Sequence, residues 1–290
     1  MRTLVDLSSF FAREAARITQ VSVLSHDANR NNVMPDYFED DHGIARNMSA
    51  RRIIILLTLG CCLAAQLQAG TQSIRAAQPK DQVYLINDGD SLLNLNGSPS
   101  GMTSMSYAMS QIKGLVGASN TSISGETLAK MVNDFSRNVG SKYQTRYDTV
   151  IVHSLGGGND IRLGTSVSEL YSLLQKYVRS VHALGPHAFS IISTYPVQCD
   201  ILKDPMQNAT LHLYNDLIYQ GWNKPQMSGG LGADGIVDYF NDPTIGANSY
   251  TYSAFCSARW SRDGEHLNDE GKEIMGQIES QAITRFLASR

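Results

Sequence analysis

YLINDGDSLLN, residues 84–94, begins like the end of a buried strand and runs into a helical turn. Two polar residues, Asp90 and Ser91, stand where the chain changes direction. In open parallel sheets, ligands bind outside the carboxyl ends of the strands, so residues that directly follow a strand are candidates for a site. The stretch therefore predicts a sheet with a reactive hydroxyl at its carboxyl edge.

Short apolar runs elsewhere favour a parallel sheet. They are bounded by turn residues and lie at residues 82–87, 148–155, 188–194 and 235–240. Apolar residues recur every three or four positions from Val167 to Leu184, which is the period of an amphipathic helix. Further helices are expected around residues 211–222 and from about Glu270 onward. Strands that alternate with helices predict an α/β domain with a largely parallel sheet.

The composition is that of a globular protein with one sizeable core. Of the 290 residues, 42% are hydrophobic and 18% are charged. The formal net charge of −3 lacks the basic excess that contacts with phosphates require, so nucleic acid is not an expected partner. The sequence has no internal repeat and no low-complexity linker, which favours a single folded domain.

Residues 48–70, MSARRIIILLTLGCCLAAQLQAG, have the layout of a secretory signal peptide. Two arginines precede an apolar run from Ile53 to Ala65, and the small residue Ala69 closes the segment. The run is shorter than the ~20 residues that span a bilayer, which argues against a membrane anchor. We therefore expect a signal peptide at residues 48–69, a secreted or periplasmic mature protein, and no stable membrane span in it.

The 47 residues before Met48 leave two alternatives. Either translation begins at Met48, or residues 1–47 form a cytoplasmic tail on an uncleaved anchor. The polar, turn-rich stretch at residues 26–43 favours the first, with the upstream extension disordered or not translated. A further alternative is a lipid anchor attached at Cys61. In each case we expect the folded domain at residues 75–290.

Cleavage near Ala69 would leave Cys199 and Cys256 as the cysteines of the mature chain. An even pair of cysteines in an exported protein is typical of a disulfide. Two separate buried thiols are the alternative, because the sequence does not measure the separation of the two residues.

Ser91, Asp263 and His266 supply the residue types that nucleophilic catalysis needs. A serine hydroxyl becomes a nucleophile when a base takes its proton, and a carboxylate assists by fixing the tautomer of that base. Asp263 and His266 are three residues apart, so a helical turn would place both on one face. The alternative is a surface histidine at a helix start, with Asp263 and Asn268 as caps.

Acyl transfer also requires hydrogen-bond donors for the oxyanion that develops in the reaction. The candidates are the side-chain amide of Asn159 and the backbone N–H groups of Gly125 and Ser91. Glycine suits such a position because its backbone can approach a ligand without a Cβ in the way. The alternatives are a helix cap or turn for Asn159 and Asp160, and a helix start for Gly125.

These motifs, in this order, resemble those of the SGNH hydrolases, also called the GDSL esterase and lipase family. The signature residues of that family fall on Ser91 in GDSL, Gly125 in ISGET, Asn159 in GGND and His266 in DGEHL, and Asp263 matches the aspartate of its DxxH pair. The resemblance covers nearly all of the expected folded domain. It implies a three-layer α/β/α sandwich, flavodoxin-like, with about five parallel strands. It also implies a triad with Ser91 as nucleophile and an oxyanion hole.

The resemblance further implies hydrolysis of esters without a metal ion or a cofactor. It leaves the substrate open, because relatives act on lipids, acetylated sugars, thioesters and aryl esters. The absence of a long apolar lid in the sequence favours a small acyl ester, on a carbohydrate or a lipid. An acyltransferase of the same fold and a non-catalytic carbohydrate-binding module are the alternatives. Aromatic residues near the site, such as Tyr195, either wall a pocket or simply pack.

Overall fold

The computed structural model describes residues 82–101 and 103–290. The predicted signal peptide at residues 48–69, the upstream extension at residues 1–47 and the alternative lipid attachment at Cys61 lie outside the described residues. The described part falls within the predicted folded domain.

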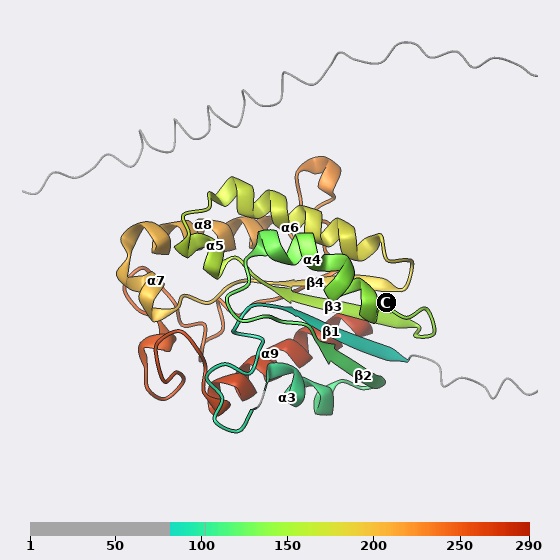
Figure 1. The fold of residues 1–290 in the computed structure, drawn as a ribbon, viewed down its shortest axis with the longest axis horizontal. Helices are drawn as coiled ribbons and strands as arrows, with labels where there is room; N and C mark the ends of the chain where they lie inside the picture. Colours follow the sequence, from blue (N-terminus) through green and yellow to red (C-terminus); the bar gives the residue numbers. More distant parts are fainter. Residues whose placement is uncertain (1–81, 102) are drawn as a thin grey trace, which may run out of the picture. The chain divides into compact units, whose positions relative to one another are not determined.

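The core of the fold is a sheet of five parallel strands in the order β2-β1-β3-β4-β5 (Figure 1). The strands are β1 (Val83–Gly89), β2 (Leu115–Asn120), β3 (Thr149–Leu155), β4 (Ala188–Ser193) and β5 (Gly235–Val237). The chain leaves β1 for β2 on one side and then adds the remaining strands on the other side. This reversal of direction creates a crevice at the carboxyl ends of β1 and β3.

Helices cover both faces of the sheet (Figure 1). One face carries α4 (Leu128–Asn138), α5 (Gly158–Arg162), α6 (Val167–His182) and α8 (Pro205–Gly221), and the other carries α3 (Ser104–Gln111) and α9 (Asp269–Ala288). The shorter elements are η2 (Gly140–Lys142), α7 (Cys199–Lys203), η3 (Gln226–Ser228) and η4 (Ala254–Cys256). The structure confirms the predicted three-layer α/β/α fold.

The two central strands determine where the crevice lies. Except for the half-buried Tyr84, every residue of β1 and β3 is buried, as expected for parallel strands covered on both faces. Their register places Gly89 opposite Leu155. A Cβ on Gly89 would lie 2.3 Å from the carbonyl oxygen of Leu155, so this close pairing requires glycine. The segments that follow β1 and β3 therefore emerge side by side.

Most expected elements are present, with some shifted boundaries. β2, α3 and α4 were not predicted, and the reason for β2 is its half-buried position at the sheet edge, where the apolar signal is weak. β5 ends at Val237 because the side chain of Asp238 turns the chain by accepting a hydrogen bond from Asn241 N at 3.2 Å. α8 begins earlier than predicted, at Pro205, with Asp204 as its N-cap.

A buried polar network joins α9 to the sheet. Oε1 of Glu279 accepts a hydrogen bond from Asn87 Nδ2 at 2.8 Å and lies 3.2 Å from His153 Nδ1. The other ring nitrogen of His153 lies 2.6 Å from Ser193 Oγ. Because an uncompensated buried polar group is costly, these contacts specify one placement of α9 against β1, β3 and β4.

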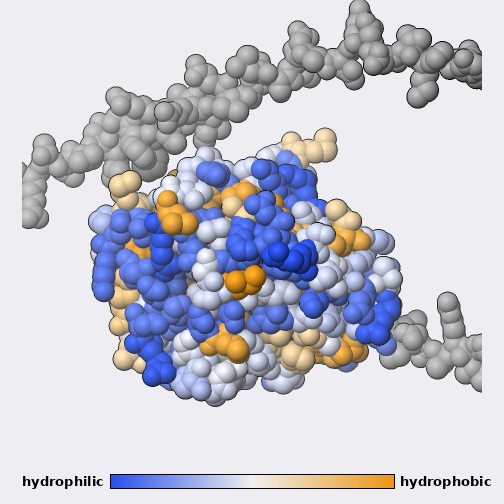
Figure 2. All heavy atoms as spheres, viewed as in Figure 1, coloured by the Kyte–Doolittle hydropathy of each residue, from blue (hydrophilic) through white to orange (hydrophobic). Residues whose placement is uncertain are grey.

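The surface of the described domain is predominantly polar on the face shown in Figure 2, where hydrophobic side chains occur as small separate spots. Within residues 82–101 and 103–290, no helix combines the length and the apolar character that crossing a bilayer requires.

Candidate active site

Ser91 lies in a tight turn directly after β1, and residues 90–94 are called the Ser91 turn below. The carboxylate of Asp90 accepts hydrogen bonds from Leu92 N at 2.9 Å and from the Tyr195 hydroxyl at 2.7 Å. Burial raises the pKa of the Asp90 carboxyl, although these bonds act in the opposite direction. Tyr195 therefore packs beneath the turn, and Ser91, which is 7% exposed, is held from within the core.

A buried lysine from α9 supports the same turn. Nζ of Lys272 donates hydrogen bonds to the carbonyl oxygens of Leu92, at 2.9 Å, and Asn94. Burial lowers the pKa of Lys272 to about 8, against the attraction of Asp90 and Asp269. Sequence reasoning missed this residue. No local pattern marks it, because a lysine in the predicted last helix is ordinarily expected on the exposed face.

His266 and Asp263 face each other within residues 263–266, called the His266 turn below. Nδ1 of His266 lies 2.8 Å from Oδ2 of Asp263. Oδ1 of Asp263 accepts backbone hydrogen bonds from Glu265 N at 2.9 Å and His266 N at 2.8 Å. The expected proximity is present, but the expected helical turn is wrong. A turn capped by the Asp263 side chain makes the contact, and α9 begins only at Asp269.

The same bonds set the charge of this pair. Burial would raise the pKa of Asp263, but hydrogen bonds from the side chain and backbone of His266 and from Glu265 N outweigh it and lower the pKa to about 2. An ionised Asp263 holds the imidazole proton on Nδ1 of His266. In this tautomer Nε2 carries no proton and can accept one, as a general base must.

The chain that follows the Ser91 turn packs directly on His266. Gly97 has a φ of 83°, in the region that favours glycine. A Cβ at Gly97 would lie 2.6 Å from the Cβ of His266 and 2.5 Å from the carbonyl oxygen of Leu267. Two segments far apart in the sequence are therefore in contact next to the carboxyl end of β1.

Residues 121–126, called the Gly125 loop below, lie alongside the end of β1. The backbone N–H of Ile123 donates to the carbonyl oxygen of Gly89 at 2.8 Å. Gly125 has a φ of 73°, and a Cβ there would meet no atom within 4 Å. The backbone of Gly125 therefore borders open space, as a position that receives a ligand must.

Asn159 follows β3 in the short helix α5. Its Nδ2 donates to the carbonyl oxygen of Glu126 at 2.9 Å, and its Oδ1 accepts from Nη1 of Arg162 at 3.4 Å. An amide nitrogen carries two protons, so one N–H of Asn159 remains free to donate. This donor lies next to the Gly125 loop, to which the side chain is bonded.

The structure thus brings the predicted site residues to one edge of the sheet. Ser91 follows β1, the Gly125 loop is hydrogen-bonded to the last residue of β1, and Asn159 follows the adjacent β3. His266, paired with Asp263, packs on the segment after the Ser91 turn. A hydroxyl, an imidazole paired with a carboxylate, and N–H donors therefore come from segments that contact one another at this edge.

Two polar residues close to the predicted site residues in the sequence, Asp160 and Asn268, act as helix caps, as the alternative interpretation proposed. Oδ2 of Asp160 accepts a hydrogen bond at 2.8 Å from the backbone of Leu128, the first residue of α4. Asn268 is the N-cap of α9, and its side chain accepts from Gly271 N at 3.0 Å. Both residues satisfy helix N-termini, which would otherwise leave backbone donors without partners.

Glu126, which sequence reasoning did not single out, is the second unexpected ionisable group. It is 1% exposed, and neither carboxylate oxygen has a hydrogen-bond partner among the described residues. Lys130 approaches only to 3.7 Å. Burial, followed by the negative charge of Asp88, raises the pKa of Glu126 to about 7. A buried carboxyl that titrates near neutral pH therefore lies next to Gly125 in this loop.

The described residues hold no metal centre, and the two cavities beside α9 lie away from Ser91 and His266. Within the described residues, no three or more His, Cys, Asp or Glu side chains are placed to hold a metal ion. Two cavities of about 410 and 530 Å³ adjoin α9, with Trp260 and Tyr107 among their respective lining residues. Neither is lined by Ser91 or His266, so these cavities do not describe the reactive crevice.

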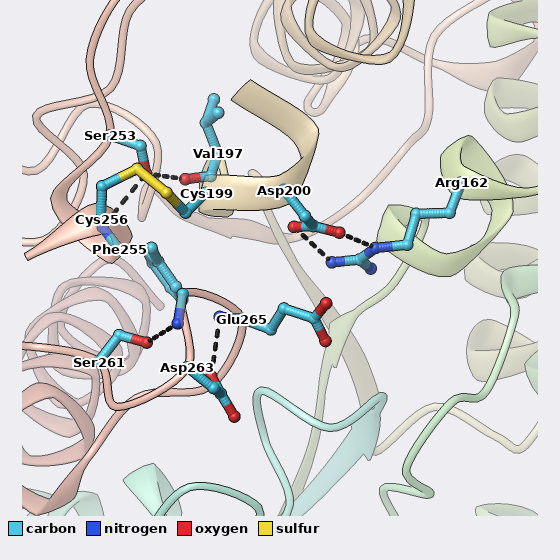
Figure 3. The surroundings of a disulfide bond; sticks show 11 residues. Arg162, Val197, Cys199, Asp200, Ser253, Phe255, Cys256, Ser261, Asp263 and Glu265 are labelled. Carbon is cyan, nitrogen blue, oxygen red and sulfur yellow. Dashed lines mark hydrogen bonds and ion pairs between the residues drawn. A yellow bond between two sulfur atoms is a disulfide. The ribbon is translucent and has the colours of Figure 1, made fainter. Parts of the chain in front are cut away.

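Of the two alternatives for the cysteines, the structure has the disulfide. Cys199, the first residue of α7, is bonded to Cys256 in η4, with the two Cα atoms 5.0 Å apart (Figure 3). The bond closes a loop across 57 residues. It holds two irregular segments together close to the His266 turn, because Cys199 N donates to the carbonyl oxygen of Gly264 at 2.8 Å.

Comparison with known proteins gives a match in fold. The sequence matches no protein-family model and no curated protein. A solved structure of a member of the lipolytic G-D-S-L family from Veillonella parvula DSM 2008 matches with a TM-score of 0.53 and 16% identity, over 70% of this chain and 99% of that chain.

Two further solved structures agree. The psychrotrophic esterase EstA from Pseudoalteromonas sp. matches with a TM-score of 0.51 and 16% identity, over 72% of this chain and 100% of that one. A protein named TesA matches with a TM-score of 0.50 and 16% identity, over 70% and 99% of the two chains. These matches confirm the predicted fold, which is that of the GDSL or SGNH hydrolases.

Proposed function

We propose that the protein is an exported serine esterase of the SGNH type, which hydrolyses carboxylic esters through an acyl-enzyme on Ser91. One observation carries the proposal. The Asp263–His266 pair, with Nδ1 and Oδ2 2.8 Å apart, sits on a turn that packs against the chain leaving the Ser91 turn. A histidine with a fixed tautomer, on a segment that contacts the chain leaving a serine at a strand end, supports nucleophilic acyl transfer.

The residues divide the chemistry among themselves. Ser91 Oγ attacks the ester carbonyl carbon while His266 Nε2 takes the hydroxyl proton, and ionised Asp263 stabilises the resulting imidazolium. The oxyanion forms next to the backbone N–H groups of Ser91 and Gly125 and the free N–H of Asn159. Collapse expels the alkoxide, which receives the proton from His266. Water, activated by the same base, then releases the acid and restores Ser91.

The substrate we propose is a small acyl ester, carried by a carbohydrate or a lipid. Relatives in fold include an esterase and a lipolytic protein, which supports ester hydrolysis in general. For the acyl group, support comes from the sequence, which has no long apolar lid to enclose a long chain. No cofactor enters the scheme, since every step uses the side chains and backbone of the site.

Export is proposed from the predicted signal peptide at residues 48–69, which would give a secreted or periplasmic protein. A disulfide such as Cys199–Cys256 persists in oxidising compartments, which supports that location. Mass spectrometry of the protein recovered from its native host should find an N-terminus near Gly70. Recovery of residues 1–47 on the mature protein would contradict export in this form, and a lipid on Cys61 would indicate the anchored alternative.

The function is tested by assaying the purified protein with p-nitrophenyl acetate and p-nitrophenyl butyrate, with Ser91→Ala as the matched control. We expect turnover of at least one ester by the wild type and none above background by the variant. If neither ester is hydrolysed, the alternative of a non-catalytic carbohydrate-binding module would be favoured. Transfer of the acyl group to an added sugar or alcohol, in preference to water, would indicate the acyltransferase.

A further inference from the structure

We propose that Arg162 is a positioning residue for the oxyanion hole, and that a turn anchored by the Cys199–Cys256 disulfide holds Arg162 in place. This inference rests on the proposed function, because it assigns a task to residues around the Asn159 amide. The turn, residues 198–200, is called the anchored turn below. It would connect the disulfide, which lies next to the His266 turn, with the donor that stabilises the transition state.

Two hydrogen bonds fix the orientation of the Asn159 amide. Its Oδ1 accepts from Nη1 of Arg162 at 3.4 Å, and its Nδ2 donates to the carbonyl oxygen of Glu126 at 2.9 Å. Rotation of the amide by 180° would set its oxygen against that carbonyl and its NH₂ group against the guanidinium. Both contacts would be repulsive. Arg162 therefore locks the free N–H of Asn159 in one direction.

Arg162 is itself held by hydrogen bonds. It donates from Nε to Oδ2 of Asp200 at 2.6 Å and from Nη2 to Oδ1 of the same carboxylate at 3.1 Å. Nη2 also donates to Oε1 of Gln198 at 2.5 Å. Burial would lower the pKa of Arg162, but its bond to Asp200 outweighs this and raises the pKa further. A charged, forked side chain held at several points is rigid enough to orient a neighbour.

The Cys199–Cys256 disulfide holds the anchored turn (Figure 3). Asp200 belongs to α7, which has five residues and no side-chain hydrogen bond at its N-cap. So short a helix has little stability of its own. Cys199, its first residue, is covalently bonded to Cys256. Ser253, three residues before Cys256, donates a hydrogen bond from its hydroxyl to the carbonyl oxygen of Val197, two residues before Cys199. The disulfide thus supplies the rigidity that α7 lacks.

The anchored turn also reaches the base. Cys199 N donates to the carbonyl oxygen of Gly264 at 2.8 Å, and Gln198 Nε2 donates to the carbonyl oxygen of Glu265 at 2.5 Å. Both acceptors belong to the His266 turn. A single short segment therefore contacts the His266 turn on one side and, through Arg162, the Asn159 amide on the other.

A misdirected donor weakens an interaction that forms only as charge develops, so its loss lowers kcat and leaves KM nearly unchanged. We expect Arg162→Met, which keeps the length of the side chain but removes its hydrogen bonds, to lower kcat about tenfold, since small misplacements cost up to about a hundredfold. Arg137→Met is the matched control, because Arg137 pairs with Asp134 on the exposed surface of α4. That variant should keep wild-type kcat.

The decisive experiment is a double-mutant cycle between Arg162→Met and Asn159→Ala, assayed with p-nitrophenyl acetate at equal amounts of fluorophosphonate-reactive protein. If Arg162 acts through Asn159, Arg162→Met lowers kcat in the wild type and causes no further loss in Asn159→Ala. An equal loss in both backgrounds, or an unchanged kcat, would overturn the inference. If Arg162→Met does not fold, Asp200→Asn, which keeps the shape of the carboxylate, is judged by the same criterion.

Replacing both cysteines, Cys199→Ala with Cys256→Ala, tests the anchor. We expect a lower kcat at temperatures well below the melting point of the variant, because α7 then holds Arg162 less firmly. Full kcat in this variant would overturn the role given to the disulfide. A wild type that hydrolyses no ester would overturn the proposed function and the inference with it, whereas an active wild type with an additive cycle overturns only the inference.

Discussion

The Ser91 turn and the His266 turn, which we propose form one site, are built in opposite ways. The Ser91 turn is supported from the core, by Tyr195 and Lys272, whose partners lie 105 and 180 residues away in the sequence. The His266 turn is capped by one of its own residues, Asp263, whose side chain is 51% exposed, and receives hydrogen bonds from Gln198 and Cys199. The Ser91 turn thus depends on buried partners in the core, whereas the His266 turn depends on its own cap and on hydrogen bonds to its backbone.

Because of this difference, substitutions in the two turns should affect different quantities, the stability of the fold in one case and turnover in the other. Changes to the supports of the Ser91 turn leave buried charges or carbonyl groups without partners, which destabilises the folded state. Changes in the His266 turn remove groups that water can replace, so they should affect the reaction far more than the fold. A variant of the His266 turn that mainly loses stability, or a variant of the supports of the Ser91 turn that loses only turnover, would contradict this difference.

The largest effect is expected from His266→Ala. Removing the base should lower kcat on the order of 10⁵- to 10⁶-fold, as for other members of serine triads. The free energy of unfolding should change by no more than about 1 kcal/mol, because the turn is held by the Asp263 side chain and backbone groups that remain. Steady-state kinetics and thermal unfolding of the same preparation measure the loss of kcat and the change in stability. A large loss of stability would break the comparison.

The next effect is expected from Asn159→Ala. Loss of one oxyanion donor costs on the order of 10² to 10³ in kcat, with KM little changed. The lost hydrogen bond to the Glu126 carbonyl should lower stability by about 1 kcal/mol. If kcat is unchanged while the melting temperature falls, Asn159 is only a turn residue and leaves the proposed site.

Lys272→Met should show the reverse pattern, with stability as the main loss. Two carbonyl oxygens of the Ser91 turn lose their donor, at a cost of about 2 kcal/mol near pH 7. The pKa of Lys272 is lowered from 10.5 to about 8, so above pH 8 the unfolded chain binds more protons and wild-type stability rises with pH. The gap between wild type and variant should therefore widen from pH 8 to 10.5, and a constant gap in urea unfolding would contradict the buried charge.

The smallest effect is expected from Glu126→Gln, which extends the comparison to the Gly125 loop. The pKa of Glu126 is raised from 4.5 to about 7, so as the pH rises through this range the unfolded chain releases its proton first and the native state loses stability. The variant lacks this loss. It should match the wild type near pH 4 and be about 3 kcal/mol more stable at pH 8. Equal stability at both pH values would show that Glu126 is not buried in this way.

The same contrast explains what could be predicted from the sequence. Asp263 and His266 are close in the chain, and Ser91 and Asn159 directly follow apolar runs, so local pattern and the order of motifs locate them. The contact of Lys272 with the Ser91 turn depends on how α9 packs, which no local pattern specifies. The edge strand β2 was missed because its half-buried residues carry a weak apolar signal.

The assignment of Ser91 as the nucleophile is tested most directly by the site at which a fluorophosphonate labels the protein. Ser91 Oγ should displace fluoride from phosphorus, with its proton passing to His266. Intact-protein and peptide mass spectrometry should find one adduct, located on Ser91, absent from Ser91→Ala and formed far more slowly in His266→Ala. No adduct on the wild type, or an adduct that persists unchanged in Ser91→Ala, would contradict the account.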